Sequence, residues 1–329
     1  MKSDVAPLTL EEIQAPVSDH LDAVFEEIAT IIEADFPLIY DVNQHLLRMK
    51  GKLFRPTLLL LSAQAVGKVT QNQITLGAIV ELVHLATLLH DDSIDHSALR
   101  RGQPTVNAEF SHEVAVIMGD YLYTRAVEQL VKLRSQDALE IMSRVTNQLT
   151  IGEMREVVSY DGLDFSEADY EKMILAKTAS LMAGACELGA LAGGPEWREP
   201  LRRYGTDLGA AFQIADDILD YSASSDVTGK PVGQDLREHK VTLPLIAVIP
   251  RLNADERRLF ERLMANPEPD DADISHAMKI VEERGGVPAA HERALELAHR
   301  AEAELEALPR SAAREALRAS ITYCVERSR

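Results

Sequence analysis

The sequence is poor in cysteine and has no long apolar run. Its two cysteines, Cys186 and Cys324, lie far apart and form no CxxC pair, a pattern that fits neither a disulfide framework nor a structural zinc site. No stretch reaches the roughly 18 uninterrupted apolar residues of a membrane span, and the N-terminal residues lack the apolar core of a signal peptide. We therefore expect a cytoplasmic protein with no transmembrane segment.

Positive charge is also scarce. The chain has 34 Lys and Arg residues against 53 Asp and Glu residues, a net charge of −19 at pH 7, which argues against nucleic acid as a partner because that needs a basic surface. It also lacks a GxxxxGK[ST] nucleotide loop, since Gly229 and Lys230 are followed by Pro231. An anionic ligand would need local cations or metal ions to overcome this field.

Strand signals are the third absence. Few stretches alternate with period two, and the clearest hairpin signal, Asp161-Gly162, has no convincing strand beside it. Apolar residues make up 46% of the chain and recur at helical spacing nearly throughout. With no low-complexity linker, the pattern predicts an all-α fold and a single domain over residues 1–329.

Two segments are apolar on nearly every face. Residues 79–89 and 208–219 have this composition, which is typical of helices buried all round. Residues 292–318 instead mix charge with alanine, which predicts an outer, solvated layer.

Three carboxylates follow the first buried segment, in the stretch LLHDDSIDHSALRRGQPT, residues 88–105. On an ideal helix Asp91 and Asp95 differ by roughly 40°, and Asp92 lies within about 60° of Asp95, so one face carries all three. His84, seven residues before Asp91, falls on nearly the same stripe. A single DDxxD pattern is weak evidence for function, because most acidic clusters are solvated helix surface.

A second cluster repeats this spacing. The stretch AFQIADDILDY, residues 211–221, holds Asp216, Asp217 and Asp220, with Gln213 on the same face. Two such clusters in buried helices are hard to interpret as surface, because crowded and desolvated carboxylates repel one another. Facing each other across a cavity, they would form an acidic site that requires divalent cations.

Magnesium suits such a site better than calcium. The glycine that an EF-hand loop requires at its sixth position is His96 in the first cluster and Tyr221 in the second. Magnesium takes one or two carboxylates per ion and completes its octahedron with water and phosphate oxygens. The sequence therefore predicts Mg²⁺ and a phosphorylated substrate.

Scattered cations beside helix breakers could hold the phosphate groups. They are Lys52, Arg55, Arg100, Arg101, Lys177, Lys230 and Lys240. Each alone is also consistent with a helix-end charge, a solvated turn or a long side chain that covers apolar surface. Their occurrence together with two acidic clusters favours a diphosphate site.

Together these motifs resemble the trans-polyprenyl diphosphate synthases, the head-to-tail isoprenyl chain-elongating enzymes. The resemblance runs from about residue 51 to 242 and includes GKLFRPTLLLLSA and GKPVGQDLREHKVTLPLI besides the two aspartate-rich stretches. Two residues depart from the family pattern, His96 where an acidic residue is expected and His239 where glycine is frequent. The resemblance implies a large single-domain helical bundle of the isoprenoid synthase type, with a deep central cavity and usually a homodimeric assembly.

The resemblance also implies roles for individual residues. Isopentenyl diphosphate would be held by Gly51, Lys52, Arg55, His84 and Arg101. The diphosphate of the allylic primer would contact Arg100, Lys177, Thr178, Gln213, Lys230 and Lys240. Magnesium would be bound by Asp91, Asp92, Asp95, Asp216, Asp217 and Asp220, of which all but the last are expected, with Lys177, to be catalytic.

The resemblance extends to product length. In this family, bulky side chains four or five residues before the first aspartate form the floor of the product pocket. These positions are Thr87 and Ala86, both small, which leaves the pocket open toward Val83. Helical geometry places Thr87 about 40° from Asp91 but Ala86 roughly 140° away, so the role of Ala86 rests on the resemblance. A long-chain product such as octaprenyl diphosphate is implied.

Three alternatives remain open. The enzyme could make a shorter farnesyl or geranylgeranyl product, or it could be a terpene cyclase or head-to-head synthase, which has no need of an isopentenyl diphosphate site. The chain could also be a non-catalytic helical subunit that binds metal or a partner. The cations Lys52, Arg55 and Arg101 argue against a cyclase, and two intact acidic clusters argue against a non-catalytic subunit.

Overall fold

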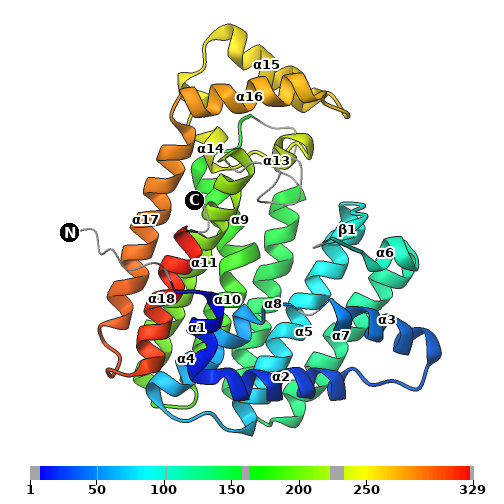
Figure 1. Cartoon of the computed structure of the whole chain (residues 1–329), viewed down its shortest axis with the longest axis vertical. Coiled ribbons are helices and arrows are strands. Elements are labelled where there is room, and N and C mark those ends of the chain that lie inside the picture. The colour runs from blue at the N-terminus through cyan, green and yellow to red at the C-terminus, as the bar shows by residue number, and fades with distance from the viewer. Residues whose placement is uncertain (1–7, 50, 101, 158–162, 223–232, 327–329) are drawn as a thin grey trace.

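The structure, a computed structural model, describes residues 8–49, 51–100, 102–157, 163–222 and 233–326. These residues form a helical bundle with one short pair of strands (Figure 1), which confirms the all-α prediction. The helices before the strands are α1 (Leu10–Gln14), α2 (Ser18–Ile31), α3 (Pro37–Arg48), α4 (Phe54–Val66) and α5 (Gln71–Ile94). The strands are β1 (Leu99–Arg100) and β2 (Gln103–Pro104), which pair antiparallel.

The helices after the strands complete the bundle. They are α6 (Val106–Glu109), α7 (His112–Lys132), α8 (Gln136–Val157), α9 (Glu167–Ile174), α10 (Ser180–Ala190), α11 (Arg198–Ser222), α13 (Gln234–Arg237), α14 (Leu243–Ile246), α15 (Ala254–Ala265), α16 (Asp271–Glu283), α17 (Gly286–Leu305) and α18 (Ala312–Glu326). A single π-helical turn, Leu175–Ala179, joins α9 to α10. Single 3₁₀ turns lie at Ala15–Val17, Pro195–Trp197 and Ile249–Arg251.

The core is built around α4, α5, α10 and α11. All four contribute long runs of buried side chains, and α10 packs against both α4 and α11. The predictions that residues 79–89 and 208–219 belong to central helices are confirmed, because these segments lie within α5 and α11. A capping box fixes the start of α5, where the Thr70 backbone N–H donates to Gln73 Oε1 at 3.1 Å.

Helix α5 combines length with apolar composition. It is the one helix of the described residues that could cross a membrane by these criteria, and 67% of its most apolar window is buried inside the protein. Burial of that extent is what a core helix requires, since its apolar side chains are already removed from water.

The outer layer differs from the sequence prediction. Residues 292–318 are not one solvated surface but parts of two helices, α17 and α18, separated at residues 306–311. Each buries one face, and α17 lies along α11 at the edge of the bundle (Figure 1). The buried face of α17 includes Ala294, Ala298 and Ala301, so the alanines that suggested solvation are the residues that allow close packing.

The C-terminal ends of α5 and α11 set the position of the site. In Figure 1 the elements that follow them, β1 after α5 and α13 after α11, both lie in the upper half of the view. Helices α15 and α16 cross above them, while α2 crosses the lower end of the bundle. Both aspartate-rich segments are therefore carried to the same side of the molecule.

Candidate active site

The first aspartate-rich segment lies at the C-terminal end of α5. Asp91 and Asp92 belong to the last turn, and Asp95 is the residue that follows the helix. The Ser97 N–H donates to the Asp92 carbonyl at 2.9 Å, and His96 has a left-handed φ of 50°, a common way to end a helix. Because a helix C-terminus carries partial negative charge, three added carboxylates make this end attractive to cations.

Asp92 is paired with Arg100 on β1. The Asp92 side chain is almost fully buried, and both of its oxygens accept hydrogen bonds from the guanidinium at 2.7–3.0 Å. Such bidentate pairs are among the stronger charge-assisted contacts. Arg100 was predicted to contact a diphosphate, and in this structure it neutralises one carboxylate of the first segment.

The second segment lies in the last two turns of α11, and Asp220 fixes the element that follows. Its two carboxylate oxygens accept hydrogen bonds from the backbone N–H groups of Gln234 and Asp235, each at 2.9 Å. These N–H groups open α13 and have no partner within that helix. Asp220 therefore attaches the start of α13 to the end of α11.

Asp217 is the most deeply buried carboxylate of the second segment, with 5% of the residue exposed. Tyr170 on α9 donates its hydroxyl to Asp217 Oδ2 at 2.5 Å, and Gln213 donates its amide to Oδ1 at 2.8 Å. Gln213 in turn accepts a hydrogen bond from Thr178 at 2.7 Å. Burial raises the pKa of Asp217 to about 7, although the hydrogen bonds from Tyr170 and Gln213 act to lower it.

Lys177 projects from the π-helical turn toward two glutamates of α8. Its ammonium contacts Glu153 Oε2 at 2.9 Å and also pairs with Glu156. Burial acts to lower the pKa of Lys177, but the charges of Glu156, Asp91 and Glu153 outweigh it and raise the pKa. Single π-helical turns often occur at functional sites. This turn determines where Lys177, which is predicted to contact the diphosphate, points its side chain.

Lys240 reaches the same place from the segment between α13 and α14. Its ammonium contacts Glu238 at 2.8 Å, Glu156 at 3.7 Å and Asp95 at 3.8 Å. Only 18% of the Lys240 side chain is exposed. Burial again acts to lower the pKa, and Glu156, Glu238 and Asp95 raise it above the usual lysine value. The two lysines and Asp95 therefore meet around Glu156.

The carboxylates near the lysines have unusual pKa values. Burial is the largest cause for Asp91, whose pKa rises to about 6 while Lys177 acts to lower it. Burial also raises the pKa of Glu153 to about 7, helped by the charge of Asp91. These groups lack full compensation inside the protein, so an added cation would relieve the repulsion.

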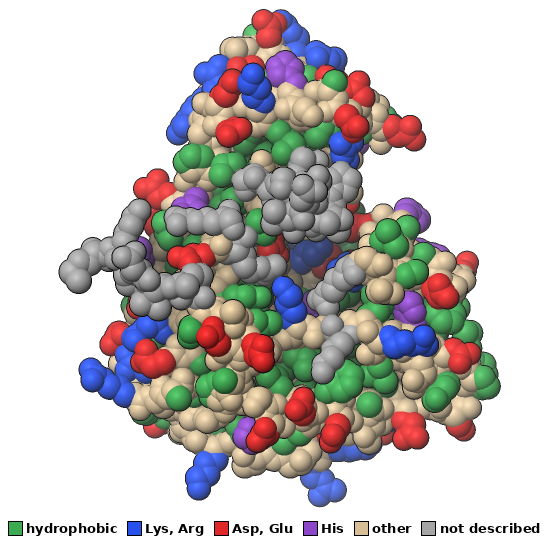
Figure 2. All heavy atoms as spheres, in the orientation of Figure 1, with side chains coloured by type: hydrophobic (Ala, Val, Ile, Leu, Met, Phe, Trp, Pro, Cys, Tyr) green, Lys and Arg blue, Asp and Glu red, His purple; other side chains and the backbone are tan. Residues whose placement is uncertain are grey.

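A cavity of about 790 Å³ opens beside Asp91, between α5, α7 and α8. Val83, Ala86 and Thr87 line it together with Asp91 and Glu153. Helical arithmetic placed Ala86 away from Asp91, yet both border the same cavity because it spans a wide arc of α5. Figure 2 shows a recess between α13 and β1 in which basic and acidic side chains gather.

The residues predicted to hold isopentenyl diphosphate are spread over two packed helices. Gly51 and Lys52 precede α4, Arg55 lies in its first turn, and His84 lies in α5. Leu53, which precedes α4, has a left-handed φ of 48°, and the Lys52 carbonyl accepts a hydrogen bond from Gln14 at 2.8 Å. Two predicted ligands, Arg101 and Lys230, lie outside the described residues.

Four residues of the site were missed from the sequence. Glu153 and Glu156 occur in the mixed stretch GEMRE and look like solvated helix surface. Tyr170 lies seven residues before Lys177, a helical spacing that could have identified it. Gly152 also escaped notice: a Cβ there would lie 2.4 Å from the Lys177 backbone nitrogen, so its absence lets α8 approach the π-helical turn.

The site offers oxygen ligands for a hard cation. Within the described ranges, no three His, Cys, Asp or Glu side chains converge as a preformed metal cluster. Magnesium does not need one, because it binds through one or two carboxylates per ion and keeps water or phosphate oxygens. The raised pKa values of Asp91 and Asp217 fit a place where cations complete the charge balance.

Comparison with known proteins gives a consistent family. The polyprenyl synthetase family model matches residues 36–281. The chain is 40% identical to an all-trans-nonaprenyl-diphosphate synthase (geranyl-diphosphate specific) of Rhodobacter capsulatus, over 93% of this chain and 94% of that protein. It is 37% identical to octaprenyl diphosphate synthase of Haemophilus influenzae, over 98% of each chain.

Solved structures agree. A decaprenyl diphosphate synthase from Rhodobacter capsulatus superposes with a TM-score of 0.93 at 33% identity, covering 98% of this chain and 100% of that one. A polyprenyl synthase from Caulobacter crescentus CB15, complexed with calcium and isoprenyl diphosphate, gives a TM-score of 0.92 at 34% identity over 99% of each chain.

Proposed function

The chain belongs to the polyprenyl synthetase family, and from this premise we infer that it is a prenyltransferase that makes a long-chain all-trans polyprenyl diphosphate. Its substrates are isopentenyl diphosphate and an allylic diphosphate primer. The observation that carries this inference is the position of Asp91, which borders a cavity of about 790 Å³ beside Ala86 and Thr87 and lies close enough to Lys177 for that charge to lower its pKa. Polar groups for a diphosphate and a wall for its hydrocarbon tail thus share one site.

The proposed reaction begins when the carbon–oxygen bond of the allylic diphosphate breaks, with both electrons left on the diphosphate oxygen. Lys177, Lys240 and Arg100 lie where they could stabilise that developing charge. Groups fixed in advance stabilise a transition state more than a ground state. Lys230, which lies outside the described residues, is proposed to join them, and Thr178 and Gln213 would steady the same diphosphate.

The allylic cation is then attacked by the double bond of isopentenyl diphosphate, which Gly51, Lys52, Arg55, His84 and Arg101 are proposed to position. A new carbon–carbon bond forms, and the intermediate loses a proton to the released diphosphate. No side-chain base is assigned. Apolar walls such as Val83 and Leu149 would keep water away from the cation.

Magnesium is the proposed cofactor, and its ligands are the aspartates of the two segments. Asp92, Asp217 and Asp220 already have both oxygens in hydrogen bonds. The proposed ligands are Asp91, Asp92 and Asp95 of the first segment and Asp216, Asp217 and Asp220 of the second, and the hydrogen bonds just described would hold three of these carboxylates in place for the ions. Bound metal supplies charge stabilisation for the departing diphosphate.

The exposed apolar side chains of α7 and α8 support the further proposal of a homodimer. They include Ile117, Val127, Val131, Ile151 and Met154, which are more than one third exposed. Large apolar side chains left exposed on two neighbouring helices are typical of an interface between subunits. Light scattering should give twice the mass of one chain, and Ile117→Asp should shift it toward the monomer.

We also place the protein in the cytoplasm. Both cysteines are buried free thiols, which suits a reducing compartment.

Product analysis tests the proposed function. Incubation with Mg²⁺, farnesyl diphosphate and isopentenyl diphosphate should give products elongated by several units, which chromatography would resolve. A parallel incubation uses geranyl diphosphate as the primer. Cyclised hydrocarbon would indicate a terpene cyclase, and no turnover with either primer would indicate a non-catalytic subunit. Products that stop at 15 or 20 carbons from the geranyl primer would indicate a short-chain enzyme.

The Ala86→Phe variant tests which wall limits the product. A ring at this position in the cavity should shorten the main product while the first condensation persists. Thr87→Ser, which keeps a small side chain on the same wall, is the matched control and should leave the product length unchanged. An unchanged product from Ala86→Phe would place the limiting wall elsewhere.

A further inference from the structure

Glu156 contacts two lysines that come from separate parts of the fold. Lys177 lies in the π-helical turn before α10, whereas Lys240 lies 63 residues later (240 − 177), between α13 and α14. One carboxylate oxygen of Glu156 pairs with Lys177, and the other lies 3.7 Å from Lys240. The carboxylate therefore bridges two ammonium groups that would otherwise repel each other.

Burial makes this bridge more effective than a surface ion pair. The exposed fractions are 14% for the Glu156 side chain, 24% for Lys177 and 18% for Lys240. Ion pairs on open surface contribute little because solvent screens them and long side chains lose rotamer freedom. Here the stems are already confined, so a shared partner can decide where the ammonium groups point.

Each lysine also has an acidic neighbour of its own. Lys177 contacts Glu153 at 2.9 Å, and Lys240 contacts Glu238 at 2.8 Å. Without the bridge, each ammonium would follow its own neighbour and the pair would separate. The carboxylate that both share keeps the two positive charges directed toward one place.

We propose that Glu156 is a positioning residue that holds Lys177 and Lys240 together as a single receptor for the diphosphate of the allylic substrate. This inference rests on the proposed function, because it assumes that the two lysines receive that diphosphate. Glu156 itself is not required to touch the substrate. Its role is to spare the substrate the cost of gathering two flexible cations, a form of preorganisation.

Gly152 supports the geometry. It lies one turn before Glu156 on α8, and its missing side chain allows the helix backbone to contact the backbone of Lys177. The approach of α8 to the π-helical turn is what brings the Glu156 carboxylate within reach of Lys177. Helix contact and ion pair therefore belong to one local arrangement.

The test measures binding of farnesyl diphosphate, with Mg²⁺ and without isopentenyl diphosphate, by calorimetry. Glu156→Gln should weaken the Kd by about three- to tenfold, a loss of the size that one partly buried ion pair supports. In steady-state assays, KM for farnesyl diphosphate should rise by a similar factor. Because the same lysines are proposed to stabilise the departing diphosphate, kcat should fall by a similar factor. The KM for isopentenyl diphosphate should change by less than twofold, a split between the two substrates that general loss of structure would not produce.

Glu153→Gln is the matched control, since Glu153 contacts Lys177 from the same helix, whereas the ion pairs of Lys240 among the described residues are with Asp95, Glu156 and Glu238. In a Lys240→Ala background, the effect of Glu156→Gln should largely disappear, while that of Glu153→Gln should persist. Such a double-mutant cycle separates coupling from independent effects. If Glu156→Gln lowers the melting temperature sharply, Glu156→Asp supplies the test, with a smaller effect in the same direction.

The outcomes are distinct. An unchanged Kd, or effects of Glu156→Gln and Lys240→Ala that simply add, would overturn the positioning role. Tighter binding would overturn it too, because Glu156 would then be competing with the diphosphate for the lysines. Wild-type protein that neither binds nor elongates farnesyl diphosphate would instead contradict the proposed function.

Discussion

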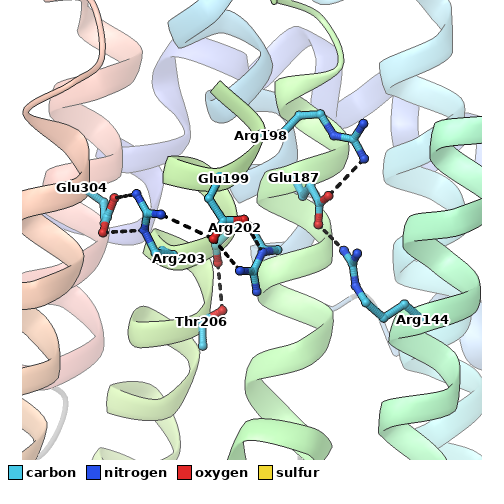
Figure 3. A network of polar contacts seen from close by, with 8 residues as sticks. All are labelled: Arg144, Glu187, Arg198, Glu199, Arg202, Arg203, Thr206 and Glu304. Atoms are coloured by element: carbon cyan, nitrogen blue, oxygen red, sulfur yellow. Dashed lines mark hydrogen bonds and ion pairs between the residues drawn. The ribbon is translucent and has the colours of Figure 1, made fainter. Parts of the chain in front are cut away.

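Two buried carboxylates on neighbouring helices are treated in opposite ways. Glu187 on α10 has a side chain only 6% exposed and pairs with two arginines, Arg144 and Arg198, the latter at 3.2 Å (Figure 3). Asp217 on α11 is just as buried, but its oxygens accept hydrogen bonds from two neutral donors, Tyr170 and Gln213. One carboxylate is neutralised within the protein, and the other is only held in place.

This difference indicates that Glu187 stabilises the fold, whereas Asp217 is available for function. A second set of ion pairs, more exposed, lies nearby and joins Glu199 and Glu304 to Arg203 (Figure 3). Two arginines of the protein itself already balance the charge of Glu187, so this carboxylate does not need a bound cation. At the candidate active site, burial raises the pKa of Asp217 to about 7. The ionised carboxylate is therefore destabilised unless a cation binds nearby.

The largest expected effect comes from removing a carboxylate of the candidate active site. Asp91→Asn removes a carboxylate charge that is proposed to bind Mg²⁺ and that lies near Lys177. Turnover should fall by about 10²–10³-fold or more. The melting temperature should stay the same or rise, because a raised pKa means that the ionised carboxylate destabilises the fold. Steady-state kinetics at saturating Mg²⁺ and a thermal melt measure the two quantities. Near-normal turnover would contradict the metal assignment.

The next largest effect comes from removing the buried carboxylate of Glu187, which is expected to stabilise the fold. Glu187→Gln leaves Arg144 and Arg198 without their shared charge partner, and because both arginines are partly exposed the cost should be about 1–3 kcal/mol in the free energy of unfolding. Below its melting temperature the variant should keep the wild-type kcat and both KM values. Urea denaturation gives the first quantity. Lost activity in a fully folded variant would show that the two regions are coupled.

The sequence predicted the site more completely for its acidic groups than for the contacts among them. Two DDxxD patterns in apolar helices reported position and chemistry at once, because few other arrangements tolerate such charges. The pairing of Asp92 with Arg100 could not be predicted, since it depends on how the β1–β2 turn folds back. Helix propensity and apolar periodicity do not carry that information.

The fold was predictable at the level of class and central helices, for a similar reason. Apolar runs report burial directly, which identified α5 and α11, whereas alanine suits both buried and exposed helix faces and misled the prediction for residues 292–318. In the π-helical turn at Leu175–Ala179, the backbone hydrogen bonds span one residue more than in an α-helix. The amino-acid composition of the segment does not indicate this change. The role proposed for Glu156 depends on that turn, which carries Lys177, and on the later segment that carries Lys240. Neither contact leaves a pattern in the sequence.

The smallest expected effect sharpens the comparison through pH. Glu153 has its pKa raised by burial from 4.5 to about 7, so between these values the folded protein keeps a proton that the unfolded chain has lost. The free energy of unfolding must then decrease as pH rises across this window. Metal-free protein should melt at a higher temperature at pH 5 than at pH 7.5, and Glu153→Gln should reduce that difference because it removes one proton-binding group. Glu187→Gln, measured in the same series, should lower every melting temperature without reducing the slope. A Glu153→Gln protein with the full wild-type slope would mean that this carboxyl titrates normally in the folded state.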